Sequence, residues 1–215
     1  MEIKKMTGLS IDDFLEELSS AKPVPGGGGA SAVSAALGAA LSNMVLHLTE
    51  GKKKYAGYQD EMISMIERLN GLIKDLSMGA DKDAEAFEPL SRAYGLKKDT
   101  PEEQEYRDKV MGEALKTASE APLELMENIL KAAEITERVS EIGSVLAISD
   151  AGAAAQLLNA SMKAASLNVF INTGLMKDKD EASGMNEKAM KLIMECDGCC
   201  TRAYDRVLSR IGVGL

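Results

Sequence analysis

One acidic residue occupies a position where the helical pattern calls for an apolar side chain. The apolar stripe of residues 62–87 contains Met62, Met65, Ile66, Leu69, Leu72, Ile73, Leu76, Ala80, Ala84 and Phe87. Asp83 falls within this stripe, whereas Asp81 and Glu85 point away from its centre. Because burial raises the pKa of a carboxyl group toward neutrality, Asp83 is the best candidate for general acid or base catalysis. Alternatively, Asp83 leaves the stripe where the helix bends, or caps a neighbouring helix.

Two amides interrupt a second apolar segment, the stretch SLNVFIN. Asn168 and Asn172 are four residues apart, so they share one face of a helix that is otherwise small or apolar. Buried amides must be hydrogen-bonded, so the pair either bridges helices or binds a heterocycle with alternating donors and acceptors. Asp150, near the start of the same helix, is either its N-cap or a contact to a ligand.

A run of four glycines, residues 26–29, lies between KPVP and an alanine-rich segment. Glycine destabilises a helix interior by about 1 kcal/mol relative to alanine, so the run requires a reason. At a helix N-terminus it would expose backbone N–H groups that suit an anion or a polar ring edge. A flexible elbow or close helix packing is the alternative. No G-K-[ST] follows the run, and GGGASA follows no strand, which argues against both nucleotide-binding fingerprints.

The three cysteines, Cys196, Cys199 and Cys200, cluster in the stretch CDGCC. A single C-x-x-C lacks the second ligand pair of a zinc site, and the one histidine, His47, is remote in the sequence. We expect reduced thiols on a helix; a redox role or a metal site between subunits is the alternative. The chain also lacks the Glu-x-x-His motif of di-metal bundles, so we predict no metal site.

Composition limits the classes of partner. The chain has 215 residues with 34 acidic and 25 basic side chains, a formal net charge of −9 that argues against nucleic acid. No run of about 18 strongly apolar residues occurs. The nearest candidate, residues 30–48, is mostly Ala and Ser and reads as a buried helix. The N-terminus lacks the apolar core of a signal peptide, so we expect a cytoplasmic protein without membrane contact.

The elements that must position these residues are all helical. Abundant Ala, Met, Leu, Glu and Lys, few aromatic residues and no Trp predict an all-α chain, and no linker divides residues 1–215 into domains. We therefore predict a single-domain bundle of long helices. The predicted helices span residues 10–20, 30–50, 59–94 with a kink at Pro89 and easing at Gly79, 101–130 with a kink or interruption at Pro122, 133–142, 150–176 and 180–211.

Two of these helices, residues 30–50 and 150–176, are built from small and apolar residues on most of their faces. A helix that is apolar all round must be buried on all sides. A monomer of this size has too little surface to surround two such helices. We therefore predict a homodimer, or a higher assembly of dimers, with apolar helical contacts.

Several motifs in a fixed order resemble one family. They are PVPGGGGASA, GKKKY, DKDAEAFEPLSRAYGL with TPEE, APLELME, and SDAGAAAQ with ASLNVFIN. Together they resemble the formiminotetrahydrofolate cyclodeaminase and methenyltetrahydrofolate cyclohydrolase family, from about residue 14 to residue 176. The resemblance implies an all-helical homodimer that binds folate in a groove at the dimer interface. It also implies the free-standing bacterial form, without the formiminotransferase domain of the animal relatives.

The resemblance implies roles for individual residues. Asp83 matches the second acid of the family's D-x-D-A-x-A-F stretch and is the implied proton donor or acceptor, with Asp81, the first acid, as the fallback. Lys52 and Lys53 fit a basic pair that would hold the glutamate tail.

The resemblance also gives the glycine run a place in the site. The glycines that would line the folate groove are Gly26, Gly27, Gly28 and Gly29. Gly29 stands where relatives often have Ser, so any role for a hydroxyl group passes to Ser31 or lapses.

The implied reaction is hydrolysis of 5,10-methenyltetrahydrofolate to 10-formyltetrahydrofolate, or, as the alternative, formiminotetrahydrofolate cyclodeamination with release of ammonia. Both pass through a tetrahedral carbon and need one group that moves protons, the role we assign to Asp83. We expect no cofactor beyond the tetrahydrofolate-based substrate. A hypothesis from another class is a non-catalytic helical assembly protein, in which the glycines and asparagines serve packing.

Overall fold

The computed structural model describes residues 5–213, and every regular element within this range is helical. The predicted all-α class is therefore confirmed; the outermost residues of the predicted domain, 1–4 and 214–215, lie outside the described range. The elements are η1 (Met6–Gly8), α1 (Ile11–Leu18), α2 (Gly27–His47), η2 (Lys53–Tyr58), α3 (Gln59–Tyr94), α4 (Pro101–Ile142), η3 (Val145–Ala147), α5 (Ile148–Leu175) and α6 (Lys179–Arg210).

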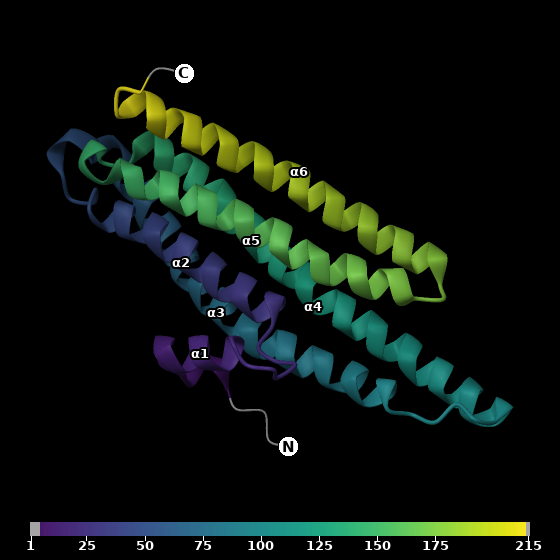
Figure 1. The fold of residues 1–215 in the computed structure, drawn as a ribbon. Helices are drawn as coiled ribbons and strands as arrows, with labels where there is room; N and C mark the ends of the chain where they lie inside the picture. Colours follow the sequence, from purple (N-terminus) through teal and green to yellow (C-terminus); the bar gives the residue numbers. More distant parts are fainter. Residues whose placement is uncertain (1–4, 214–215) are drawn as a thin grey trace.

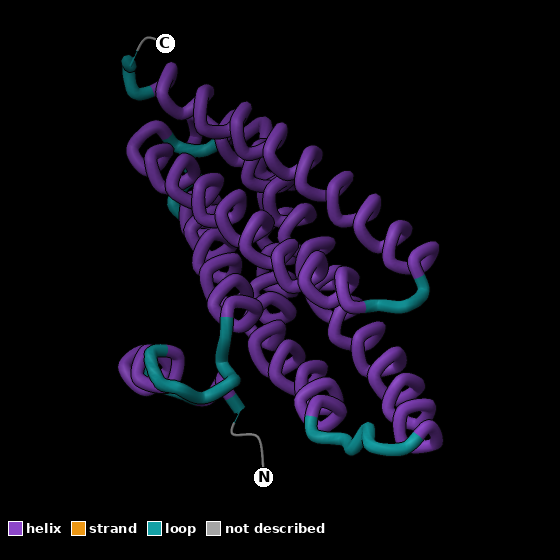
Figure 2. Tube along the Cα trace, turned by 45° about the vertical axis from the view of Figure 1, so that its right-hand side comes forward, coloured by secondary structure: helices purple, strands orange, loops and turns teal. Residues whose placement is uncertain are grey.

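The helices α2 to α6 run up and down along one elongated bundle (Figure 1). The helices α3 and α4 are the longest, and the turn between them projects beyond the other helix ends. The short helix α1 lies apart from the bundle axis, to one side of α2 and α3, as Figure 2 shows most clearly. Successive long helices alternate in direction, so α3 and α5 run parallel to each other with α4 antiparallel between them.

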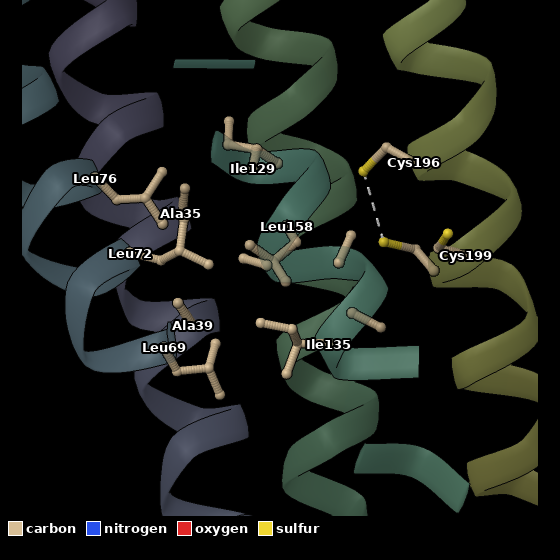
Figure 3. Close-up of a cluster of buried hydrophobic side chains, with 14 of the residues drawn as sticks. Ala35, Ala39, Leu69, Leu72, Leu76, Ile129, Ile135, Leu158, Cys196 and Cys199 are labelled. Atoms are coloured by element: carbon tan, nitrogen blue, oxygen red, sulfur yellow. Dashed lines mark hydrogen bonds between the residues drawn. The ribbon is translucent and has the colours of Figure 1, made fainter. Parts of the chain in front are cut away.

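The small residues of α2 lie at the centre of the bundle, as their composition predicts. Ala35 and Ala39 are fully buried, and Figure 3 shows them beside the leucines of α3, with Leu158 of α5 nearby. A Cβ atom at Gly38 would lie 2.9 Å from Cγ of Leu158, so the two helices approach too closely for alanine. At the neighbouring contact, a Cβ atom at Gly79 would lie 3.1 Å from that of Ala32. The predicted easing of α3 at Gly79 is therefore wrong: the helix continues, and the glycine permits close packing.

Neither small-residue helix is buried on all sides within one chain, which agrees with the expectation that a monomer has too little surface to surround both. Large apolar side chains are exposed on α2, including Leu37, Met44 and Leu48, and on α5, including Leu167 and Ile171. Among the described residues, α2 is the one helix long and apolar enough to cross a membrane by length and composition. Its alanine face is packed inside the bundle, as in a core helix of a globular protein.

The helix α4 is continuous from Pro101 to Ile142, so the predicted interruption at Pro122 and the predicted end at residue 130 are both wrong. Proline at residue 122 has no N–H group for the carbonyl of Ala118, one turn earlier. The side chain of Asn172 on α5 donates a hydrogen bond to that carbonyl at 2.8 Å. A tertiary contact therefore replaces the missing bond of the helix. At its start, Thr100 and Glu103 form a capping box.

The three cysteines lie on α6 and face the core, and no disulfide links them in the described part of the chain. The sulfur atoms of Cys196 and Cys200 are 3.8 Å apart. This contact, together with burial, raises the pKa of the Cys196 thiol, and burial raises the pKa of Cys199 to about 11. Both groups therefore stay protonated at neutral pH and are poor nucleophiles. Residues 5–213 contain no cluster of three or more acidic, histidine or cysteine side chains placed to hold a metal ion.

Candidate functional site

A pocket of about 300 Å³ lies between the start of α2, the second half of α3 and the end of α5. Its volume is at the lower end of the range for small-molecule sites. Its polar side chains are Asp83, Tyr94, Asn168 and Asn172, and the backbone of Gly26, Gly27 and Gly28 forms part of the wall. The pocket thus brings together the three features that the sequence singled out: the acid in the apolar stripe, the glycine run and the two amides.

The contact between Gly28 and Asp83 explains why glycines stand at this position. A Cβ atom on residue 28 would lie 2.0 Å from Oδ1 of Asp83, far closer than a Cβ atom can approach another heavy atom that is not bonded to it. At Gly29 the Cβ atom would lie 3.3 Å from that of Pro25, and at Gly27 it would have ordinary contacts only. The helix α2 begins at Gly27, three residues before the predicted start. Glycine destabilises the helix here, but a residue without a side chain is required to leave room for the carboxyl group of Asp83.

Asp83 is partly buried, and its carboxylate accepts a hydrogen bond from the backbone N–H of Gly29. Burial raises the pKa of Asp83 above its ordinary value, and the Gly29 hydrogen bond offsets only part of this rise. Gly26, the N-cap residue of α2, has no side chain that could cap the helix. The carboxylate of Asp83 on α3 caps it instead. The helix-capping alternative and the acid–base role are therefore compatible, since a carboxylate has two oxygens.

The two amides have different surroundings. Asn168 lies opposite the glycine run, with its Nδ2 atom 3.9 Å from the place that a Cβ atom on Gly27 would take. The Nδ2 group of Asn172 is used by the carbonyl of Ala118, as described above. Asn172 thus bridges helices, as one alternative proposed, and also forms part of the pocket wall.

Two candidates on the same helices have other partners. The carboxylate of Asp81 accepts hydrogen bonds from the backbone N–H of Met6 and, at 2.7 Å, from the hydroxyl of Thr7. Asp81 therefore fastens the N-terminal segment to α3 and does not line the pocket. The hydroxyl of Ser31 donates to the carbonyl of Gly27 at 2.6 Å, within its own helix.

The remaining candidates lie at the opposite end of the bundle. The ammonium group of Lys52 donates to Ser144, which precedes η3, at 3.2 Å. Lys53 begins η2, just beyond the end of α2. Asp150 lies in the first turn of α5, whose N-cap is Ala147, so the N-cap alternative for Asp150 is wrong. The length of α2, about 30 Å, separates this end from the glycine run.

Sequence reasoning missed the apolar half of the pocket. Phe87, Leu90 and Tyr94 follow Asp83 along the same face of α3, and Ile171 and Leu175 follow Asn168 along α5. The signal was the helical spacing itself, which continues past residue 87 to Tyr94. Periodicity alone places Phe87 at the end of a core stripe, because it does not distinguish a core face from a pocket wall.

Comparison with known proteins places the chain in a family. The family model described as formiminotransferase-cyclodeaminase matches residues 10–191. The methenyltetrahydrofolate cyclohydrolase of Methylorubrum extorquens is 38% identical over 202 residues, which are 94% of this chain and 97% of the relative. The formimidoyltransferase-cyclodeaminase of Mus musculus is 31% identical over 186 residues, 86% of this chain but 34% of that longer protein.

A solved structure agrees with the sequence relatives. The formiminotetrahydrofolate cyclodeaminase of Thermotoga maritima superimposes with a TM-score of 0.85 at 29% identity, over 95% of this chain and 98% of that chain. The likeness thus extends over nearly the whole length of both molecules. With the family match, it confirms the resemblance carried by the sequence motifs: this chain belongs to the formiminotransferase-cyclodeaminase family.

Proposed function

We propose that the chain is a methenyltetrahydrofolate cyclohydrolase, an enzyme of folate one-carbon metabolism. The observation that carries this function is the carboxyl group of Asp83, whose pKa is raised by burial, held against the glycine start of α2 inside a pocket. The relative from Methylorubrum extorquens, which this chain matches over 97% of its length, supports the choice of reaction. The substrate carries a cationic N–C–N bridge, which a carboxylate attracts.

Asp83 can serve both halves of the hydrolysis. As water attacks the bridging carbon, the carboxylate accepts a proton from it, and a tetrahedral intermediate forms. The bond from this carbon to N5 then breaks, and Asp83 returns the proton to N5. Collapse of the intermediate to the formyl group on N10 releases the second proton of the water. A raised pKa suits a group that must accept and then donate a proton. Only water and protons move, so the proposal needs no cofactor beyond the tetrahydrofolate substrate.

Formiminotetrahydrofolate cyclodeaminase is the second candidate, supported by the likeness to the Thermotoga maritima structure. In that reaction N10 attacks the formimino carbon, and the bond from this carbon to the terminal nitrogen breaks. Asp83 would accept the proton that N10 loses and pass it to the terminal nitrogen, which takes up a second proton from solvent and leaves as ammonia. Comparison of kcat/KM for the two substrates on one preparation decides between these reactions.

A homodimer would bring the two lysines at the end of α2 close to the glycine run of the other subunit. Lys52 and Lys53 lie about 30 Å from the glycine run within one chain. If the exposed stripe of Leu37, Met44 and Leu48 pairs with a second α2 in antiparallel fashion, the partner subunit's Lys52 lies near this chain's pocket. Two-fold contacts of this kind are self-complementary. We propose this dimer, in the cytoplasm, with the lysines holding the anionic tail of the substrate; a species of one chain in sedimentation analysis would contradict it.

The test of the function is loss of the absorbance of methenyltetrahydrofolate with purified protein. We expect Asp83→Asn to lower kcat by about 10²–10⁴-fold, the usual contribution of a general acid or base. Glu85→Gln, on the exposed side of the same helix, is the matched control and should retain full activity. Wild-type protein that accelerates neither folate reaction, and shows no thermal shift with folates, would favour the non-catalytic assembly protein.

A further inference from the structure

The pocket has two walls that run in the same direction. Along α3 the lining side chains include Asp83, Phe87 and Tyr94, and along α5 they include Asn168, Ile171 and Leu175. Since α3 and α5 are parallel, both series advance from the glycine run toward the same mouth. From residue 83 to residue 94 the α3 wall rises about 16 Å, so the pocket is an elongated slot.

The chemistry of the slot changes along its length. The inner end holds the carboxyl group of Asp83, the amide of Asn168 and the backbone of Gly27. The mouth is formed by Tyr94, Ile171 and Leu175, which are 51%, 67% and 54% exposed. Single exposed apolar residues are common on protein surfaces. These three converge on one pocket from two helices, which favours an apolar, flat ligand group between them.

We propose that the slot binds its substrate in one orientation, with the pterin ring at the glycine end and the benzoyl ring at the mouth. This inference rests on the proposed function. The reacting carbon of such a substrate lies between its two ring systems, and this carbon must be within reach of Asp83. The pterin ring then lies beside Asp83, against Asn168 and the glycine backbone, and the benzoyl ring extends toward Tyr94. Tyr94 and Leu175 thereby become residues that determine specificity for the benzoyl group.

The pterin ring and the benzoyl ring need different protein groups around them. The pterin edge carries alternating donors and acceptors, which Asn168 and the backbone N–H groups at the start of α2 can satisfy. The benzoyl ring presents apolar faces, which pack well against Tyr94 and the aliphatic side chains opposite. The reverse orientation would place the polar pterin edge among apolar side chains and leave the amide of Asn168 without a partner.

The test separates the two ends by titration calorimetry with substrate fragments. The probes are 6-methyltetrahydropterin and p-aminobenzoylglutamate. We expect Tyr94→Ala to weaken binding of p-aminobenzoylglutamate about three- to tenfold, the contribution of one aromatic contact, and to leave pterin binding unchanged. Asn168→Ala should have the opposite pattern. Tyr106→Ala is the matched control, since Tyr106 is 62% exposed on α4 and lies outside the pocket.

Several outcomes would overturn this orientation: a Tyr94→Ala protein that loses pterin binding instead, equal losses of both fragments, or wild-type protein that does not bind p-aminobenzoylglutamate. Because calorimetry measures binding without turnover, failure of the proposed function is a separate result. Wild-type protein that binds both fragments in the expected pattern but turns over neither folate substrate would contradict the enzyme and leave the orientation standing.

Discussion

The carboxyl group of Asp83 occupies the space that any side chain on Gly28 would need. A Cβ atom at residue 28 would lie 2.0 Å from Oδ1 of Asp83, although the two residues belong to different helices. The glycine on α2 and the acid on α3 therefore form one unit. The carboxyl group lies between a helix N-terminus, which favours its ionised form, and buried surroundings, which oppose that form.

Substitution of this glycine should remove catalysis without touching the acid. We expect Gly28→Ala to displace the Asp83 carboxyl group and to lower kcat about 10²-fold or more, the loss expected when a general acid or base is misplaced. Gly27→Ala is the matched comparison, because the nearest atom to its Cβ would be 3.9 Å away, an ordinary contact. The measurement is the rate of methenyltetrahydrofolate hydrolysis. Equal rates for the two variants would show that the contact does not position the acid.

The raised pKa of Asp83 predicts that this residue lowers the stability of the folded protein while it serves catalysis. Because folding raises this pKa above its ordinary value of 3.8, the protonated form stabilises the fold, and that stability is lost as pH rises through the folded pKa. Asn resembles the protonated acid and can still accept from Gly29. Asp83→Asn should therefore melt at a higher temperature than wild type above neutral pH, and the difference should vanish near pH 3.8. A variant that is less stable at every pH would contradict this prediction.

Asp81 should affect the N-terminal segment and not the reaction. Its carboxylate binds the backbone of Met6 and the hydroxyl of Thr7, away from the pocket. Each hydrogen bond of this kind contributes about 0.5–1.5 kcal/mol. We expect Asp81→Asn to increase hydrogen exchange in η1 and α1 while kcat stays within twofold of wild type. A large fall in kcat with unchanged exchange would restore Asp81 as a catalytic candidate.

The local parts of the fold were predictable from the sequence because their causes are local. Ser10 accepts from the backbone N–H of Asp13 at the start of α1, a cap whose two residues are only three positions apart. The periodicity of α3 likewise placed Asp83 on the inner face, where it meets the pocket. Both signals depend on residues within one or two helical turns, which is the distance over which sequence patterns are informative.

The rest depends on contacts between distant segments, which no local pattern contains. The start of α2 at Gly27 depends on Asp83, 56 positions further along the chain. Lys52 and Lys53 were grouped with the glycines through resemblance alone, which carries no distances, and the fold places them at the other end of α2. The mouth of the pocket could not be predicted because Tyr94 faces a cavity formed only when α5 packs against α2 and α4, opposite α3.

The path of α4 through Pro122 gives the last prediction. Asn172 donates to the carbonyl of Ala118 at 2.8 Å, the group that Pro122 leaves without its helical partner. Asn172→Ala would leave this carbonyl unsatisfied, so we expect a loss of about 1–3 kcal/mol in the free energy of unfolding.

The matched background is Pro122→Ala, which restores a backbone N–H group to α4 and lets the Ala118 carbonyl bond within its own helix. In this background the effect of Asn172→Ala should shrink, and a double-mutant cycle measured by urea unfolding gives the coupling between the two positions. Because Pro122 is buried, its own substitution also leaves space in the core, but the cycle cancels that contribution. Additive effects would mean that Asn172 stabilises the bundle independently of the proline, and that α4 continues through residue 122 for another reason.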